Sequence, residues 1–452
     1  MPLSPGLATS AEALLAPRIE SRIVPGLERM RAALAALGHP ERDLPAVLVV
    51  GTNGKGSTAA LLASVLGACG LRVGMTTSPH LVRVEERIRV SGTRITTERL
   101  LEHLGELRSF PELSYFETVT TAAILEFAAS GVDVAVLEAG LGGRWDASNV
   151  VDPEVALLTN VGTDHQAWLG DTRVAIAAEK AAALRGREII VGEWDTEVEG
   201  SIRAAADPAA PISLASQWAQ VTRDERPGTA NSGPGSGIHV SSLSCAHRPR
   251  PLSPVSCPLA LSGTPIEFSV LGRQGRAVLP LAGDHQLPNL TLALAAAAAL
   301  AKHGLMPALS VETVAQGIQS VRWPGRLQWL EQHGRALLLD GAHNREAVAA
   351  LARSVSRLGL PRLDLLFSCL ADKPLAEMAA LLRPLVANVT VVPLSSPRAM
   401  DINTLAAAFP GCRLACSVEA ALASLPIDRP VLVTGSLRLV GEVLTIAGVH
   451  DA

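Results

Sequence analysis

Short apolar runs alternate with helical patterns along most of the chain. In the first two hundred residues, the runs that predict buried strands are Ala46–Val50, Val132–Leu137, Val155–Leu158 and Ile189–Val191. Helical patterns lie between them, at Ala59–Ala68, Thr118–Ala129 and Thr172–Leu184. Because strands that alternate with helices form parallel sheets covered on both faces, this part predicts an α/β domain. Ligands of such sheets bind at the carboxyl ends of the strands.

The alternation restarts after Trp323-Pro324-Gly325-Arg326. The second series of strands is predicted at Ala336–Leu339, Leu363–Phe367, Val389–Val392 and Val431–Val433, with helices at Glu346–Leu358, Leu375–Leu382 and Leu437–Ile446. We therefore expect two domains, residues 1–328 and 334–452, with the boundary near 328–334 and a cleft between the two sheets. Residues 224–258 are rich in Pro, Ser, Gly and Arg, which predicts a long surface excursion.

Composition excludes several classes of protein. The 452 residues are 48% hydrophobic and 18% charged, which excludes wholesale disorder. The net charge of −4 carries no basic footprint for nucleic acid and no polybasic membrane patch. The longest bland run, Leu290–Ala301, is too short to span a bilayer and predicts a buried helix. With no secretory signal apparent and six scattered cysteines that form no CxxC pair, we expect a cytoplasmic protein.

A glycine loop follows the first apolar run. Its residues are Gly51-Thr52-Asn53-Gly54-Lys55-Gly56-Ser57-Thr58. Glycines let backbone N–H groups approach an anion, the following helix N-terminus adds partial positive charge, and Lys55 adds a full charge. This layout is typical of a site for a nucleotide triphosphate, although Gly56 separates Lys55 from the hydroxyl that usually follows it. The alternative is a plain turn with a solvated lysine.

Three further side chains follow strands or lie on helices of the first domain. Glu138 ends the second apolar run and precedes a glycine cluster, which suits Mg²⁺; the alternative is a helix cap or an ion-pair partner. His165 follows the third run, and because Mg²⁺ prefers oxygen, a general base or a hydrogen-bonding neighbour is an equal reading. Lys180 lies among alanines, where a lysine usually faces solvent; if buried, it would need an anion or a modified amine.

The second domain repeats the order of strand, acidic residue, glycine and helix. Asp340 and His343 lie in Asp340-Gly341-Ala342-His343-Asn344, directly after a predicted strand. Asp340 could orient a ribose or adenine, and the alternative is a helix-capping Asp or Asn. Asn289, Arg326 and Asp340 are expected near the domain junction, where the planar fork of Arg326 suits a γ-phosphate.

Taken together, these motifs resemble the bacterial dihydrofolate synthase/folylpolyglutamate synthase family, within the ATP-dependent Mur-type amide ligases. The resemblance spans roughly residues 44–441 and rests on the glycine loop with Ser78-Pro79-His80-Leu81, Tyr115-Phe116-Glu117, Glu138 with Gly140-Leu141-Gly142-Gly143-Arg144-Trp145-Asp146-Ala147, Thr159-Asn160, Asp164-His165, Glu179-Lys180, Gly283-Asp284-His285-Gln286, Asn289, Pro324-Gly325-Arg326, the segment from Asp340 to Asn344, and Thr434-Gly435-Ser436-Leu437. It implies a larger N-terminal P-loop ATPase-like domain with a mostly parallel sheet, and a smaller C-terminal Rossmann-like domain.

The resemblance also assigns residues to roles. It implies that ATP is bound by Gly54, Lys55, Gly56, Ser57, Asn289, Arg326 and Asp340, that Mg²⁺ is bound by Ser78, Glu138 and His165, and that the pterin is bound by Ser114, Tyr115, Phe116, Glu117, Trp145, Asp146 and Ala147. Lys180 matches a lysine that is carbamylated in the family, which would let it bind a second Mg²⁺. Lys55, Lys180, Arg326 and His343 are the implied catalytic residues. Two positions depart from the family pattern: Arg345 stands where Pro is common, and Trp145 stands where a smaller aliphatic is usual.

The activity implied by this resemblance is the addition of L-glutamate to dihydropteroate and to tetrahydrofolate or folylpolyglutamates, through an acyl phosphate, in folate biosynthesis. The implied cofactors are ATP and two Mg²⁺ ions, with room for a monovalent cation, and the expected state is a monomer without nucleic-acid or membrane partners. The alternatives are another Mur-type amino-acid ligase and a non-catalytic nucleotide-binding switch.

Overall fold

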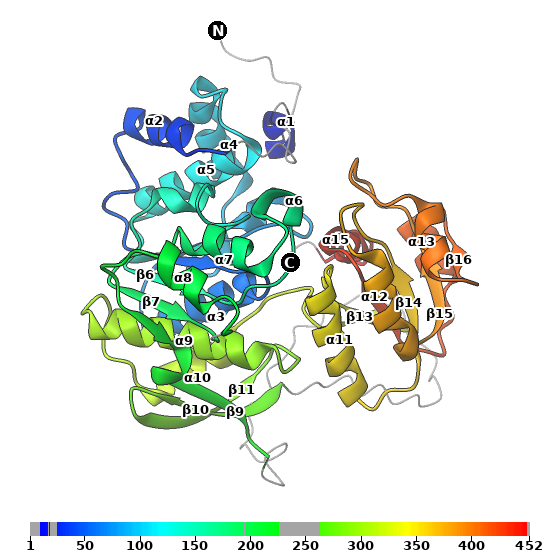
Figure 1. Cartoon of the computed structure of the whole chain (residues 1–452). Helices are drawn as coiled ribbons and strands as arrows, with labels where there is room; N and C mark the ends of the chain where they lie inside the picture. The colour runs from blue at the N-terminus through cyan, green and yellow to red at the C-terminus, as the bar shows by residue number, and fades with distance from the viewer. Residues whose placement is uncertain (1–9, 17, 19–24, 194, 226–262, 450–452) are drawn as a thin grey trace, which may run out of the picture.

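Eight strands build the sheet of the first domain. They are β1 (Ala46–Val50), β2 (Val73–Thr76), β3 (Ile88–Val90), β4 (Thr93–Arg94), β5 (Val134–Glu138), β6 (Val155–Leu158), β7 (Glu188–Val191) and β8 (Ile212–Leu214). Their order is β4-β3-β2-β5-β1-β6-β7-β8, and all neighbouring pairs are parallel except those that β3 forms with β2 and with β4. The structure, a computed structural model, describes residues 10–16, 18, 25–193, 195–225 and 263–449 (Figure 1).

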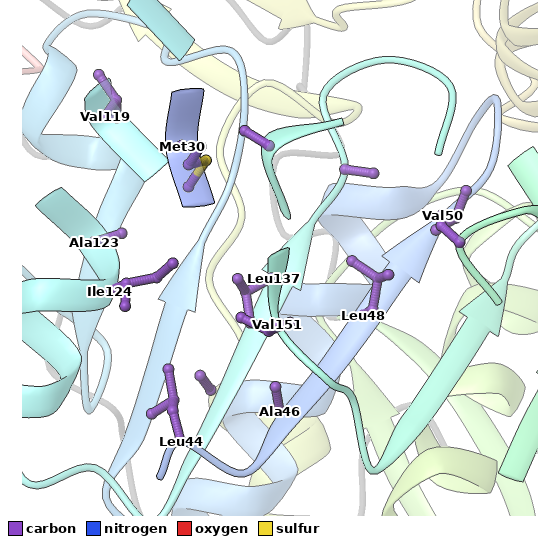
Figure 2. Close-up of a cluster of buried hydrophobic side chains, with 14 of the residues drawn as sticks. Met30, Leu44, Ala46, Leu48, Val50, Val119, Ala123, Ile124, Leu137 and Val151 are labelled. Carbon is purple, nitrogen blue, oxygen red and sulfur yellow. The ribbon is translucent and has the colours of Figure 1, made fainter. Parts of the chain in front are cut away.

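Helices cover both faces of this sheet. They are α1 (Ala11–Leu15), α2 (Glu28–Ala36), α3 (Lys55–Ala68), α4 (Thr97–Glu106), α5 (Tyr115–Ser130), α6 (Gln166–Leu169), α7 (Arg173–Ala181), α8 (Glu199–Ala205), α9 (Gln286–Lys302) and α10 (Val311–Ser320). Because successive strand residues point to opposite faces, Ala46, Leu48 and Val50 of β1 pack with α2 and α5 (Figure 2). Val47 and Val49 pack with α3, α9 and α10. The buried helix predicted over 290–301 is confirmed as part of α9.

A small antiparallel sheet lies on the α9 side of the first domain. It consists of β9 (Ala219–Arg223), β10 (Thr264–Val270) and β11 (Arg273–Leu279), in the order β11-β10-β9. Ile266 and Phe268 of β10 join the core that contains α9. Residues 226–258, most of the excursion predicted between β9 and β10, lie outside the described residues.

Six strands form the sheet of the second domain. They are β12 (Gln328–Gln332), β13 (Arg335–Leu339), β14 (Leu363–Phe367), β15 (Val386–Val391), β16 (Arg413–Leu414) and β17 (Val431–Thr434), in the order β12-β13-β17-β14-β15-β16. One face packs α11 (Arg345–Arg357), α12 (Leu375–Leu382) and α13 (Ile402–Ala408), and the other packs α14 (Val418–Ser424) and α15 (Leu437–Ile446). The predicted fold class, two α/β domains of which the first has a mostly parallel sheet, is confirmed.

The region of the expected boundary contains a strand. Residues 328–332 form β12, which pairs antiparallel with β13 and forms the edge of the second sheet. Its residues Gln328, Glu331 and Gln332 are polar, as suits a strand with one open edge, so the hydrophobic pattern did not reveal it. Figure 1 shows α11 and α15 on the side of the second domain nearest the first. Within the described residues, no helix has the length and apolar character needed to cross a membrane.

Candidate active site

The turn between β1 and α3 leaves a helix N-terminus open. Gly54 precedes α3 in a left-handed conformation (φ +83°), and no side chain caps this helix. A Cβ at Gly54 would lie 2.3 Å from Asn289 Oδ1, so only glycine fits between the loop and α9. Residues 54–57 line a cavity of about 440 Å³. The N–H groups at the start of α3 are therefore available to an anion in that cavity.

Two lysines donate hydrogen bonds to the backbone of this loop. Lys55 Nζ donates to the carbonyl oxygens of Gly51 and Thr52, each at 3.1 Å, and Lys180 Nζ donates to the same Gly51 oxygen at 2.9 Å. Lys180 is only 3% exposed, so the reading of a solvent-facing charge is wrong. Burial, with the nearby charge of Lys55, lowers the pKa of Lys180 to about 7. A neutral amine is the form that can react with CO₂, so this environment suits carbamylation.

Glu138 is the last residue of β5, next to β1 in the sheet. Its Oε2 accepts a hydrogen bond from the Ser78 backbone N–H at 2.9 Å, and no described residue donates to Oε1. Burial raises the pKa of Glu138, although the charges of Lys55 and Arg326 oppose the shift. The buried Glu138 carboxylate therefore has one oxygen without a hydrogen-bond donor in the described part of the chain, next to an anion site. This arrangement fits a divalent cation, which would favour the ionised form of the carboxylate. Ser78 and Glu138 both line the cavity.

His165 lines the same cavity from the carboxyl end of β6. It adopts a left-handed conformation (φ +60°) before α6. Burial lowers its pKa to about 4, so the imidazole is neutral at pH 7 and has a lone pair for a metal or a proton. Within the described ranges, no group of three or more His, Cys, Asp and Glu side chains is arranged to hold a metal. This does not exclude Mg²⁺, which usually keeps water and substrate phosphates among its ligands.

A polar network that includes Asp164 joins the two domains. Lys373, from the turn after β14, places Nζ 2.8 Å from Asp164 Oδ1, and Asn344 Nδ2 donates to Asp164 Oδ2 at 3.1 Å. Burial opposes ionisation of Asp164, but His165, Lys373 and His343 together hold its pKa well below the usual range. Sequence reasoning gave Lys373 no role, and it offered Asn344 only as a possible helix cap, which it is: its side chain accepts from Ala347 N at the start of α11. The available signal was a lysine directly after a buried strand, in Ala371-Asp372-Lys373-Pro374.

The site residues predicted at the domain junction and in the second domain reach the same cavity. Arg326, Asp340 and His343 line it, together with Asn289 from α9. Asp340 does not cap α11: its Oδ2 accepts from Leu327 N and its Oδ1 from Ala342 N, each at 2.9 Å, which fixes the turn after β13. Burial lowers the pKa of the Arg326 guanidinium and of His343.

The two predicted pterin segments lie beside the cavity and do not line it. Ser114 and Glu117 form a reciprocal cap at the start of α5, and Asp146 accepts a hydrogen bond from Leu141 N at 2.8 Å. The first segment reaches the cavity wall where the Phe116 ring packs on Gly140, whose Cβ would lie 2.7 Å from the ring. Tyr115 follows Ser114 in α5, Ala147 is buried, and Trp145 is 51% exposed. Local structure accounts for Ser114, Glu117 and Asp146, so their role toward a pterin stays a prediction.

Comparisons with known proteins place this geometry in a family. Residues 49–188 match the Mur ligase middle domain, and residues 325–437 match the Mur ligase, glutamate ligase domain. The chain is 33% identical to the folylpolyglutamate synthase of Lacticaseibacillus casei, over 92% of each chain. It is 31% identical, over 94% of its length, to the Haloferax volcanii protein named "Probable bifunctional folylpolyglutamate synthase/dihydropteroate synthase", of which it spans 48%.

A solved structure agrees. Escherichia coli FolC in complex with DHPP and ADP matches with a TM-score of 0.80 and 29% identity, covering 99% of this chain and 100% of that one. The full-length match to the Lacticaseibacillus casei enzyme and the two matched Mur ligase domains confirm the resemblance found in the sequence. The chain belongs to the dihydrofolate synthase/folylpolyglutamate synthase family of Mur-type ligases.

Proposed function

We propose that the chain is an ATP-dependent ligase that adds L-glutamate to dihydropteroate and to reduced folates. One observation carries the proposal: the open N-terminus of α3 and Lys55 line the same cavity as Arg326 and His343 of the second domain. A triphosphate held by the first domain would thus meet the domain that matches the glutamate ligase model. The Escherichia coli relative binds ADP and DHPP, which supports the same substrate class here.

The chemical problem is that a carboxylate is a poor electrophile. Transfer of the γ-phosphoryl group breaks the β,γ P–O bond of ATP and forms an acyl phosphate, releasing ADP. The amine of glutamate then attacks the acyl carbon, the C–O bond to phosphate breaks, and the amine loses a proton. Lys55 and Arg326 would stabilise charge on the transferring group, and contact between the domains would exclude water from the acyl phosphate.

The residues present fit Mg²⁺. Ser78, Glu138 and His165 would hold one ion, which neutralises negative charge on the phosphates when bound. Lys180, if carbamylated, would offer oxygen ligands to a second ion. The two-ion count, the monovalent cation, the monomeric state and the cytoplasmic location stay predictions.

The test is product analysis. The purified chain is incubated with ATP, Mg²⁺, glutamate and either dihydropteroate or tetrahydrofolate, and products are measured by mass spectrometry alongside ADP release. We expect one glutamyl residue added to dihydropteroate and one or more to tetrahydrofolate. Product formed only with a UDP-sugar acceptor would favour another Mur-type ligase. Tight ATP binding without amide formation under any mixture would favour a nucleotide switch.

A further inference from the structure

A single carboxylate holds the second half of the loop that begins at Ser78. Glu86 Oε2 accepts a hydrogen bond from Leu81 N at 2.8 Å, and Oε1 accepts from Val82 N at 2.9 Å and from Arg83 N at 2.7 Å. Glu86 is buried, and it does not line the cavity. Bonds from backbone N–H groups to an ionised carboxylate are stronger than neutral ones, so this clamp fixes the path of residues 81–83.

The clamped segment rests on the second domain. Leu81 and Val82 pack against the core that contains Leu439 and Val440 of α15. A Cβ at Gly441 would lie 1.9 Å from the Leu81 carbonyl oxygen, so the loop backbone touches α15 where only glycine leaves room. The Leu81 side chain also lies 3.4 Å from where a Cβ at Gly325 would be, directly before Arg326 in the chain.

The first half of the loop reaches the other parts of the site. Ser78 N donates to Glu138, the candidate metal ligand, at 2.9 Å. Arg87 donates from Nε to His80 Nδ1 at 2.8 Å, and its guanidinium lies 5.1 Å from the centre of the Tyr115 ring. This short loop therefore contacts the candidate metal site and the second domain directly, and it is linked to a predicted pterin segment through Arg87.

We propose that Glu86 is a positioning residue, which seats Leu81 between Gly325 and Gly441 and so holds Arg326 against the nucleotide cavity. It touches neither the nucleotide nor the reacting atoms. Its influence on turnover rests on the proposed ligase function, but its influence on nucleotide binding does not. The competing explanation is that Glu86 only stabilises the fold of the first domain.

A double-mutant cycle separates the two explanations. We would measure the Kd of the ATP analogue AMPPCP with Mg²⁺ by calorimetry, and the Tm, for the wild type, Glu86→Gln, Leu81→Ala and the double variant. The amide of Glu86→Gln cannot accept all three bonds, so we expect about tenfold weaker binding. If Glu86 acts through Leu81, the double variant binds about as weakly as the weaker single variant. The proposal would be overturned if the fold changes in Kd of the two single variants multiplied in the double variant. It would also be overturned if Glu86→Gln lowered the Tm and left the Kd unchanged.

Two further variants complete the test. Asp401→Asn alters another carboxylate that accepts two backbone N–H bonds, at the start of α13, and should leave Kd unchanged. Gly441→Ala displaces Leu81 from the opposite side with Glu86 intact, and should weaken binding even if Glu86→Gln does not fold; an unchanged Kd would contradict the proposal. AMPPCP binding requires no ligation. If the double-mutant cycle gives the expected Kd values but the chain forms no glutamylated product, only the proposed function is refuted.

Discussion

The two domains use one local arrangement in opposite ways. In each, a buried strand leads through a glycine-containing turn into a helix: β1 to α3 through Gly51–Gly54, and β13 to α11 through Asp340–Asn344. The N-terminus of α3 has no side-chain cap, whereas Asn344 Oδ1 accepts a hydrogen bond from Ala347 N at 2.9 Å and caps α11. An open N-terminus can bind an anion, and a capped one has already used a donor. This difference favours α3 over α11 as the proposed phosphate site, with the second turn contributing side chains.

The same asparagine also joins the two turns. Asn344 Nδ2 donates to Asn53 Oδ1 at 2.9 Å, so the cap of one helix contacts the loop before the other. The second turn therefore serves in docking as well as in ligand contact. Substitutions on each side should separate these functions.

The largest effect, a loss of turnover, is expected from substitutions near the uncapped N-terminus of α3. Lys55→Ala removes the full charge from the phosphate loop, and Glu138→Ala removes the candidate metal ligand. Each should reduce glutamate-dependent ADP release by about 10³-fold or more, since in the proposed mechanism both groups stabilise charge in the transition state. Turnover is measured by a coupled ADP assay, with circular dichroism as the control for folding. Near-normal turnover in either variant would refute the assigned roles.

Breaking the contact between Lys373 and Asp164 should cause a large loss of stability. Lys373→Met leaves the buried Asp164 carboxylate without its lysine partner, and the free energy of unfolding should fall by about 3–5 kcal/mol. Urea unfolding measures the loss. Adding Asp164→Asn should restore part of it, because the buried charge is then removed. Equal stability of Lys373→Met and wild type would show that the pair contributes nothing to docking.

Gly54→Ala tests whether the open N-terminus needs its left-handed glycine. The substitution costs about 1–2 kcal/mol of backbone strain and drives a methyl group into Asn289, so nucleotide affinity should fall at least about tenfold. Gly38→Ala is the matched control: its φ is also +83°, but no atom of the described residues lies within 4 Å of its Cβ position. It should lose stability without losing affinity for AMPPCP, and a similar affinity loss in both variants would refute the local explanation.

A smaller effect, on stability, is expected at the capped N-terminus of α11. Asn344→Ala removes the cap of α11 and should destabilise the chain by about 0.5–2 kcal/mol, read as a lower Tm. Asn344→Ser keeps a capping oxygen and loses the donor to Asn53, so it separates capping from docking. If Asn344→Ala instead tightened phosphate binding, α11 would have to be considered as an anion site.

The last prediction is a pH dependence, spread over several pH units. Unmodified Lys180 has a pKa of about 7 in the folded chain and about 10.4 when unfolded. Between these values the unfolded state binds more protons, so its contribution to the free energy of unfolding rises with pH, by at most about 1.4 kcal/mol per unit. Chemical unfolding at several pH values, compared with Lys180→Met, measures it. A difference that is flat from pH 7 to 10 would indicate a carbamylated or differently placed amine.

Buried strands and the site residues at their ends were readable from the sequence; exposed strands and contacts between domains were not. Ala46–Val50, Val155–Leu158 and Leu363–Phe367 were predicted with their observed bounds, because central parallel strands are continuous apolar runs. β11 and β12 escaped because polar residues occupy their open faces. The contacts of Asn344 and Lys373 with the first domain could not be read locally, because they depend on Asp164, some two hundred residues away, and only folding brings these residues together.

The position of β1 between β5 and β6 has a consequence for how such an enzyme could change. The three strands are paired in register, with Val49 opposite Glu138 and Val50 opposite Leu158. Adjacent strands lie about 4.8 Å apart whatever their sequence, so strand pairing fixes the spacing between residues at the carboxyl ends of neighbouring strands. A new acceptor substrate can therefore be accommodated by remodelling the turns, while the spacing between the phosphate loop and its acidic neighbour stays fixed.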